Sequence, residues 1–166
     1  WIVSTLEVDW GHFPSEADKA WAERIIAEDP RITLWRGLGH ADLIQRMRQA
    51  HVFVSTTFAD PFNNTILEAM GTQLPIIGSQ VSSLPEVVQH GRNGWLLQVE
   101  GRDSDAIADD LTFHLRQLMD DAALCELMGK ASLAVVREKF DLRVRNEKIA
   151  GVYAKALGAS IGDSST

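Results

Sequence analysis

Short apolar runs alternate along the chain with longer segments of helical spacing. The runs are rich in β-branched residues and occupy positions 2–8, 31–35, 52–56, 75–79 and 95–99. Runs of this kind are typical of strands buried on both faces, and each intervening segment is long enough for a crossover helix. The pattern therefore predicts an α/β domain in which helices flank a parallel sheet.

Each segment between two runs carries a helix start signal or an amphipathic spacing. The helices predicted there cover 16–28 after Ser15, 41–49, 63 or 64 to 71, and a short segment from 84. Ser83 and Glu86 have the spacing of a capping box, with Pro85 at the first helical position. A capping box explains Glu86 without any contact to a ligand.

Beyond residue 104 the apolar period is purely helical. One face runs through residues 107, 111, 115 and 118, and another through 124, 127, 128, 131 and 135. Asp141 can cap a final helix that ends near residue 157, and we expect its Ile149, Val152 and Tyr153 to face inward. The small, polar segment 158–166 is predicted to be a flexible tail, so the domain covers 1–157.

Composition narrows the possible partners and the location of the chain. A length of 166 residues with 45% hydrophobic and 23% charged residues indicates one globular domain. The net charge of −7 argues against nucleic acid as a partner, and the apolar runs fall far short of the roughly 20 residues of a membrane span. Because Cys125 is the single cysteine, we expect a cytoplasmic location, which includes peripheral sites on the inner membrane face.

The segment after the third run has the layout of a ligand site. A strand ends near Ser55, Asp60 follows in a loop before Pro61, and a helix then carries Glu68 on its second turn. In open α/β sheets, ligands bind beyond the carboxyl ends of strands, where a helix start offers unpaired N–H groups. The amides of Phe62, Asn63, Asn64 and Thr65 are therefore predicted to bind a phosphate.

The spacing of the two acids favours hydroxyl binding over hydrolysis. If Asp60 and Glu68 both lay on a helix, they would be about 12 Å apart, beyond the roughly 5 to 9.5 Å of a glycosidase pair. Carboxylates repel a diphosphate but accept hydrogen bonds from neutral vicinal hydroxyls. Two acids beside an anion site therefore point to a sugar nucleotide.

An ordered set of motifs surrounds these acids. Glu68 lies in a Leu-Glu-Ala-Met segment, followed by Leu-Pro-Ile-Ile at 74–77, Leu-Pro-Glu-Val at 84–87 and Gly-Arg-Asn-Gly-Trp-Leu at 91–96. This order resembles the donor-binding, C-terminal domain of the retaining GT-B glycosyltransferases of family four, the glycosyl transferases group 1. The resemblance implies a Rossmann-like sheet, a nucleoside diphosphate sugar as donor substrate and no further cofactor. It also implies transfer of the sugar to a hydroxyl of a carbohydrate or lipid-linked acceptor, as in polysaccharide or glycoconjugate synthesis.

The resemblance also implies residue roles. Glu68 holds the ribose hydroxyls, Asp60 holds hydroxyls of the transferred sugar, and the amides of 62–65 touch the sugar or the diphosphate. Gly37 resembles the glycine after the family's third strand, which places Leu38 near the base. The chain departs from the family in having Asp60 where Glu is usual and Asn63 where Gly or Pro is usual.

Part of the family pattern is expected upstream of residue 1. The Arg and Lys pair that holds the diphosphate lies between the family's first two strands, and this chain resembles the family from its second strand onward. The chain starts at Trp1 without an initiator Met, so we expect an excerpt that lacks the first strand and the N-terminal GT-B domain. In the strand order 3-2-1-4-5-6 the first strand lies mid-sheet, so the excerpt alone should be defective in folding and catalysis.

Other readings remain open from the sequence. A non-catalytic sugar-nucleotide-binding module and a sugar-nucleotide epimerase of the same fold are alternatives to the transferase. No metal is predicted, because the five histidines lack ligand spacing, and Ser55 and Ser79 lack the glycines of a nucleophile elbow. Gly91 and Gly94 are expected to serve a turn, and His114 is expected to be a partly buried helical histidine.

Overall fold

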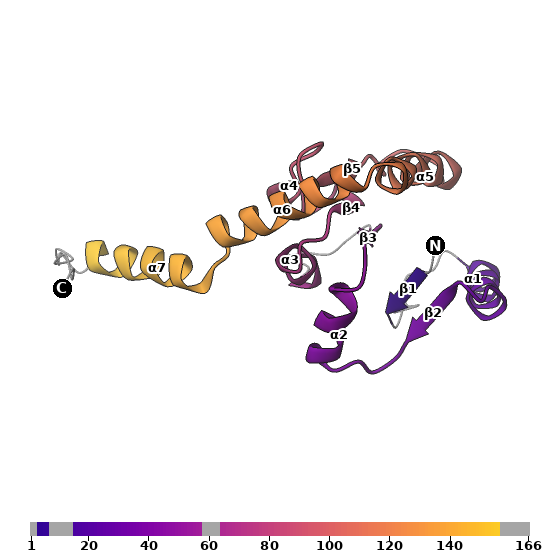
Figure 1. Ribbon diagram of the computed structural model, residues 1–166, viewed down its shortest axis with the longest axis horizontal. Coiled ribbons are helices and arrows are strands. Elements are labelled where there is room, and N and C mark those ends of the chain that lie inside the picture. Colours follow the sequence, from indigo (N-terminus) through magenta and orange to yellow (C-terminus); the bar gives the residue numbers. More distant parts are fainter. Residues whose placement is uncertain (1–2, 7–14, 58–63, 157–166) are drawn as a thin grey trace. The chain divides into compact units, whose positions relative to one another are not determined.

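The structure is a computed structural model that describes residues 3–6, 15–57 and 64–156 (Figure 1). Within these ranges strands and helices alternate up to β5, and three helices follow. The elements are β1 (Val3–Leu6), α1 (Glu16–Glu28), β2 (Ile32–Trp35), α2 (His40–Met47), β3 (Phe53–Ser55), α3 (Asn64–Gly71), β4 (Ile76–Ser79), α4 (Leu84–Val87), β5 (Gly94–Leu97), α5 (Ser104–Asp120), α6 (Ala122–Lys139) and α7 (Leu142–Ala156). Each predicted apolar run contains one strand, so the predicted alternation is confirmed.

The chain divides into two compact units, residues 1–43 and 44–166. In the first unit β1 and β2 pair in parallel, with Val3 opposite Ile32 and Leu6 opposite Trp35. Helix α1 begins at the predicted residue because the Ser15 hydroxyl accepts the Asp18 N–H at 3.2 Å. No residue of α1 is buried, and its apolar side leaves Trp21 59% exposed.

The second unit is built on a three-stranded parallel sheet in the order β3-β4-β5. Phe53 lies opposite Ile76, and Ile77 lies opposite Trp95. All four residues of β4 are buried because this strand has a neighbour on each side. The parallel sheet flanked by helices confirms the predicted α/β class.

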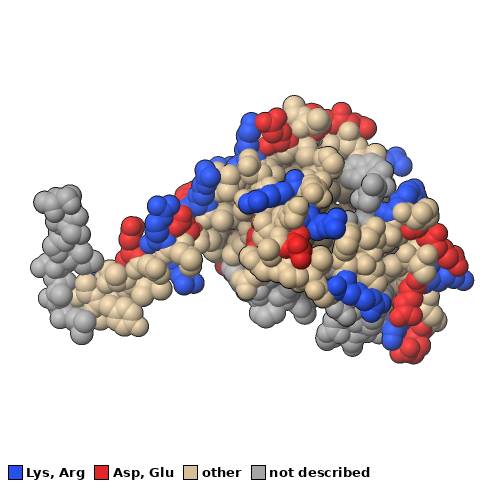
Figure 2. Space-filling model, turned by 60° about the horizontal axis from the view of Figure 1, so that its bottom comes forward, with Lys and Arg blue, Asp and Glu red and all other residues tan. Residues whose placement is uncertain are grey.

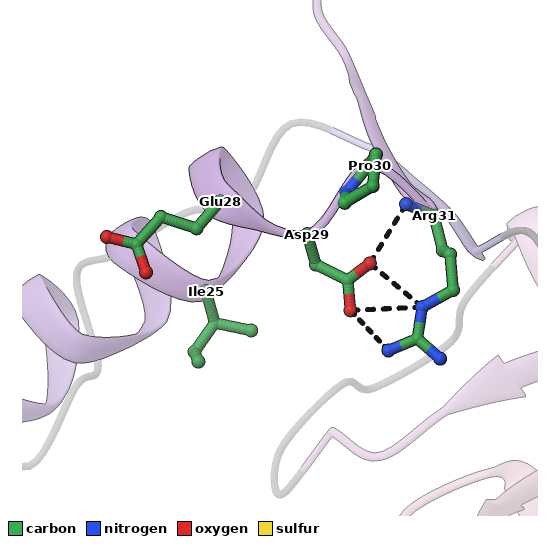
Figure 3. Close-up of a pocket in the computed structure, with 5 residues that line it drawn as sticks. All are labelled: Ile25, Glu28, Asp29, Pro30 and Arg31. Carbon is green, nitrogen blue, oxygen red and sulfur yellow. Dashed lines mark hydrogen bonds and ion pairs between the residues drawn. The ribbon is translucent and has the colours of Figure 1, made fainter.

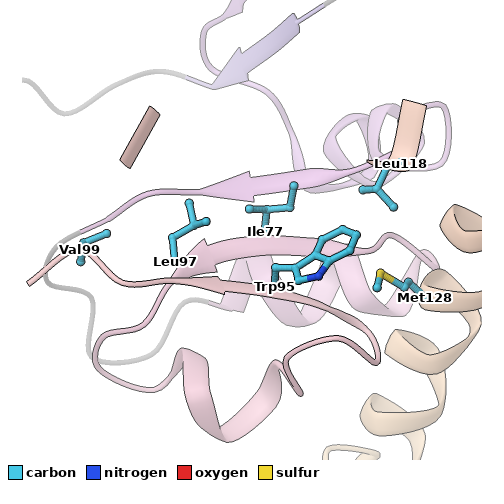
Figure 4. Close-up of a cluster of buried hydrophobic side chains, with 6 residues drawn as sticks. All are labelled: Ile77, Trp95, Leu97, Val99, Leu118 and Met128. Carbon is cyan, nitrogen blue, oxygen red and sulfur yellow. The ribbon is translucent and has the colours of Figure 1, made fainter. Parts of the chain in front are cut away.

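One face of this sheet packs on helices α5 and α6. Figure 4 shows the cluster of buried side chains, which consists of Ile77, Trp95, Leu97, Val99, Leu118 and Met128. The predicted stripe of α5 completes it, since Ile107, Leu111 and Leu115 pack against the cluster as half-buried side chains. At about 25 cal/mol per Å² of apolar surface removed from water, such a cluster stabilises the unit strongly.

Four hydrogen bonds made by Asn93 fix the amino end of this sheet. The Asn93 side chain accepts the Gln89 N–H at 2.7 Å and donates to the Val87 carbonyl at 3.1 Å. The Asn93 carbonyl accepts from the Ile76 N–H and from the Ser132 hydroxyl of α6. A fully buried amide with these partners ties α4, β4, β5 and α6 together.

Helix α3 ends in a Schellman motif against α6. The Leu74 N–H donates to the Ala69 carbonyl and the Gln73 N–H to the Met70 carbonyl, with Gln73 at φ +65°. A Cβ at Gly129 of α6 would lie 2.1 Å from the Gln73 carbonyl oxygen. Only glycine lets the two helices approach this closely.

Two expectations about the helices are wrong. Ile149, Val152 and Tyr153 are 46%, 69% and 66% exposed, because no described element covers the face of α7 on which they lie. The capping box at Ser83 does not form: Ser83 has helical φ and ψ, and its side chain makes no capping hydrogen bond. The short turn is held instead by the Glu86 N–H, which donates to the Ser83 carbonyl at 3.0 Å.

Within the described residues, no helix is both long enough and apolar enough to span a bilayer. The predicted tail, 158–166, lies outside the described residues.

Candidate functional site

The carboxyl ends of β3, β4 and β5 meet at one edge of the sheet, because the three strands are parallel. Two of these strands end in a hydroxyl side chain, Ser55 on β3 and Ser79 on β4. Helix α3 begins shortly after β3 and contacts both β3 and β4. This edge is where ligands bind in open α/β sheets.

Helix α3 presents its candidate residues away from the core. Its buried residues are Ile66, Ala69 and Met70, which form one stripe. Asn64 and Glu68 are four residues apart and therefore lie together on the opposite side of the helix, where Asn64 is exposed and Glu68 is half-buried. The half-buried Thr65 lies beside them on the first turn. The burial pattern thus leaves the Glu68 side of α3 outside the core.

The polar end of β4 has two unusual features. The Ser79 hydroxyl is fully buried and has no hydrogen-bond partner among the described residues. Ser82, three residues later, has φ +51°, a left-handed conformation that non-glycine residues seldom adopt. No described histidine or carboxylate is bonded to the Ser79 hydroxyl, so nothing in the described chain activates it as a nucleophile.

The other predicted site residues lie either in the first unit or outside the described residues. Gly37 and Leu38 follow β2 in the first unit, and Gly37 has φ +61°, which suits a glycine at the end of a strand. Asp60, Phe62 and Asn63 lie outside the described residues. Asn64, Thr65 and Glu68 are therefore the predicted site residues that the structure places on one element.

A surface hollow of about 380 Å³ lies elsewhere, where α1 ends and β2 begins (Figure 3). Its floor contains an ion pair between Arg31 and Asp29 at 2.6 Å, and the Arg31 guanidinium lowers the pKa of Asp29 to about 2. This hollow is at the amino end of β2, opposite to the edge where parallel sheets bind ligands. We therefore assign it no part in the candidate site.

The charges of the described chain are mixed in sign. On the face shown in Figure 2, acidic and basic side chains alternate and form no large field of one sign. Among the described residues, no three His, Cys, Asp or Glu side chains are grouped to hold a metal ion. The groups available at the edge of the sheet can therefore form hydrogen bonds: the carboxylate of Glu68 as an acceptor, and the amide of Asn64 and the hydroxyl of Thr65 as donors or acceptors.

Sequence reasoning missed the residues that support this edge. Asn93 was noted only as part of the motif at 91–96, without a structural role. Gly129 was not predicted to matter, although an isolated glycine inside a helical pattern is a known signal of close packing. Gly94 was expected to serve a turn, and the structure adds a reason: its Cβ would lie 1.9 Å from the Ile76 carbonyl oxygen. The local sequence does not reveal the bonds of Asn93 to distant elements, because Ile76 lies on β4 and Ser132 on α6.

Comparison with solved structures identifies the class of fold. Sucrose-phosphate synthase from Thermosynechococcus elongatus superposes on 95% of this chain with a TM-score of 0.73 at 22% identity, and the match covers 39% of that protein. Pneumococcal O-GlcNAc transferase GtfA, solved with UDP and GlcNAc, superposes on 84% of this chain with a TM-score of 0.68 at 27% identity, over 28% of its own length. The fold is that of the C-terminal half of a GT-B glycosyltransferase.

Sequence comparison identifies the family. Residues 10–117, more than half of the chain, match the model of the glycosyl transferases group 1. N-acetyl-alpha-D-glucosaminyl L-malate synthase of Bacillus anthracis is 37% identical over 94 residues, which are 57% of this chain and 22% of that enzyme. The chain belongs to the glycosyl transferases group 1. It spans between about a fifth and two fifths of the length of the similar proteins named above.

Proposed function

We propose that this chain is the donor-binding part of a retaining glycosyltransferase. It binds a nucleoside diphosphate sugar, and the whole enzyme transfers the sugar to an acceptor hydroxyl in polysaccharide or glycoconjugate synthesis. The acceptor is a carbohydrate or a lipid-linked molecule. Membership of the glycosyl transferases group 1 supports this proposal, as does similarity to an N-acetyl-alpha-D-glucosaminyl L-malate synthase and to an O-GlcNAc transferase solved with UDP and GlcNAc.

The observation that carries the proposal is the orientation of α3. The helix follows the carboxyl end of β3, buries Ile66, Ala69 and Met70, and leaves Asn64 and Glu68 on its outer side. A carboxylate in this place accepts hydrogen bonds from a vicinal diol, and the start of the helix offers N–H groups to a phosphate. A sugar nucleotide carries both groups.

We infer the residue roles from the resemblance to the family. Glu68 holds the ribose hydroxyls, and the backbone amides of Phe62, Asn63, Asn64 and Thr65 contact the sugar or the diphosphate. Asp60 holds hydroxyls of the transferred sugar, while Gly37 and Leu38 lie near the base. The bond from the anomeric carbon to the diphosphate breaks as the acceptor oxygen bonds to the same face of that carbon, and the departing phosphate takes the acceptor proton.

The complete site includes parts beyond these residues. β3 lies at an edge of its sheet, and its Val54 is 39% exposed. We propose that the open edge of β3 pairs with a further parallel strand, and that an Arg and Lys pair near it holds the diphosphate. The acceptor binds to a separate N-terminal domain.

Calorimetric titration of the whole protein with UDP, GDP and ADP and their sugars tests the role of Glu68. A hydrogen bond to a charged group contributes about 1.5 to 3 kcal/mol, so Glu68→Ala should weaken nucleotide binding by roughly 10- to 150-fold. Glu68→Gln keeps one acceptor and should lose less. Glu138→Ala, which removes an exposed acid of α6, is the matched control and should bind like the wild type.

The outcomes separate the site from the function. Unchanged affinity in Glu68→Ala overturns the role of Glu68, and absence of binding to any of these nucleotides by the folded whole protein overturns the proposed function. Product analysis then distinguishes the alternatives. Transfer to water or an acceptor identifies the transferase, an epimerised sugar identifies an epimerase, and binding without turnover identifies a non-catalytic module.

A further inference from the structure

The outer edge of the three-stranded sheet is covered by a histidine. β5 pairs with β4 on one side, and on its other side the turn after α4 runs alongside it. His90 bridges to Gly94, and the Gly91 N–H donates to the Gly94 carbonyl at 2.8 Å. Further along this edge the Leu96 N–H donates to Nδ1 of His90 at 3.1 Å. The imidazole thus accepts a hydrogen bond from the Leu96 N–H of β5, which does not bond to β4.

This hydrogen bond fixes the protonation state of His90. A backbone N–H can only donate, so Nδ1 must carry a lone pair and the proton of the neutral ring lies on Nε2. A second proton on His90 would place an N–H against the Leu96 N–H. Protonated His90 therefore cannot keep the contact with β5. Because its side chain is exposed, protons reach the ring from solvent.

His114 of α5 lies next to His90 and behaves differently. The two ring centroids are 6.3 Å apart at an interplanar angle of 86°. His114 stacks on Trp95 at 4.6 Å and 18°, and its Nδ1 lies 3.0 Å from Oε1 of Gln117. A protonated His114 keeps both contacts, since it donates to Gln117 and places a cation over an indole face.

Within the described part of the chain, no ion pair joins a carboxylate to His90. On its own turn Arg92 donates to Gln89, and on α5 Asp110, one helical turn before His114, is paired with Arg102. The ion pairs found among the described residues include neither imidazole.

We propose that His90 is a pH-sensitive lock on the open edge of β5. The neutral imidazole closes the edge by accepting the Leu96 N–H. On acidification the ring takes a second proton and releases Leu96, while the hydrogen bonds of Gly91 and Asn93 still hold the turn. The sheet then presents an unpaired backbone donor at an edge, the feature that promotes association between strands of different chains.

Hydrogen exchange and NMR on the whole protein test the lock. Between pH 7.5 and pH 5.5, the protection of the Leu96 amide, corrected for the intrinsic exchange rate, should fall roughly two- to tenfold, the worth of one hydrogen bond. In His90→Gln, an amide oxygen accepts without titrating, and protection should stay constant. His114→Gln keeps His90 and should show the wild-type fall. Constant protection in the wild type, or an equal fall in His90→Gln, overturns the proposal.

A second measurement covers the case in which Gln at residue 90 does not reach Leu96. In the wild type, the ¹⁵N shifts of His90 should show an unprotonated Nδ1 at pH 7.5, and the Leu96 amide shift should follow the His90 titration with the same midpoint. A protonated Nδ1 at pH 7.5, or a Leu96 amide that ignores the His90 titration, overturns the lock. These readouts need no nucleotide, so they are independent of the proposed function.

Discussion

Gly129→Ala tests the close approach between α6 and the end of α3. In an ordinary helix interior, alanine in place of glycine stabilises by about 1 kcal/mol. Here the new Cβ would lie 2.1 Å from the carbonyl oxygen of Gln73, and that oxygen belongs to the backbone of a Schellman motif. It cannot rotate away, so the helices must separate by about 1 Å. Overpacking of this kind costs about 1 to 3 kcal/mol, and more where backbone must move.

We expect Gly129→Ala to lower the free energy of unfolding by about 1 to 2 kcal/mol after the gain in helix propensity, which corresponds to a fall in Tm of about 2 to 8 °C. Thermal and urea unfolding measure it. The matched control is Gly151→Ala in α7, where a Cβ meets nothing within 4 Å. This variant gains helix propensity without a clash, so its helix content measured by circular dichroism should be equal to or higher than that of the wild type. A Gly129→Ala variant as stable as the wild type would refute the close packing.

Three further predictions concern single side chains. Ser79→Ala should raise the free energy of unfolding by about 1 kcal/mol in urea melts, because it removes a fully buried hydroxyl without a described partner; a loss of stability would show that the hydroxyl is bonded. The Arg31 guanidinium holds the pKa of Asp29 at about 2, so the stability from this pair is complete above the ordinary value of 3.8 and is lost as the pH falls through about 2. Asp29→Asn should flatten that pH dependence in urea melts between pH 4 and pH 2, and an unchanged slope would contradict it. Burial raises the pKa of the Cys125 thiol, which also donates to the His51 carbonyl at 3.1 Å; iodoacetamide at pH 8 should therefore react more slowly with the native protein than with the urea-unfolded chain, and equal rates would contradict the burial.

The succession of elements could be predicted from local pattern because each element is amphipathic or apolar by itself. The start of α1 at Glu16 follows from a Ser15 cap that the sequence shows directly. The stripe through Leu111 and Leu118 follows from helical periodicity, and both side chains pack on the sheet as that periodicity predicts. Local chemistry was sufficient for these features because cap and stripe each involve residues close in sequence.

Features that depend on distant partners could not be predicted in the same way. Periodicity shows that Ile149 and Tyr153 share a face of α7, but it does not say what covers that face. The Schellman motif at Gln73 lacks the usual glycine, so its left-handed residue gave no sequence signal. The spacing of Ser83 and Glu86 fits a capping box, yet the Glu86 N–H donates to the backbone carbonyl of Ser83, just before the four-residue α4, and not to its side chain.

The packing of α3 links stability to the proposed site. Its carboxyl end is fixed by the contact of Gln73 with Gly129, and its buried stripe holds the middle of the helix in the core. The helix is only eight residues long, so a shift of about 1 Å at Gln73 is carried along it as along a rigid rod to Glu68. Hydrogen bonds weaken steeply when their geometry is displaced by this much. We therefore expect Gly129→Ala to weaken nucleotide binding as well as stability, although residue 129 contacts no ligand in the proposed site. Calorimetry at a temperature where the variant stays folded measures this, and unchanged affinity would show that the two ends of α3 are positioned independently.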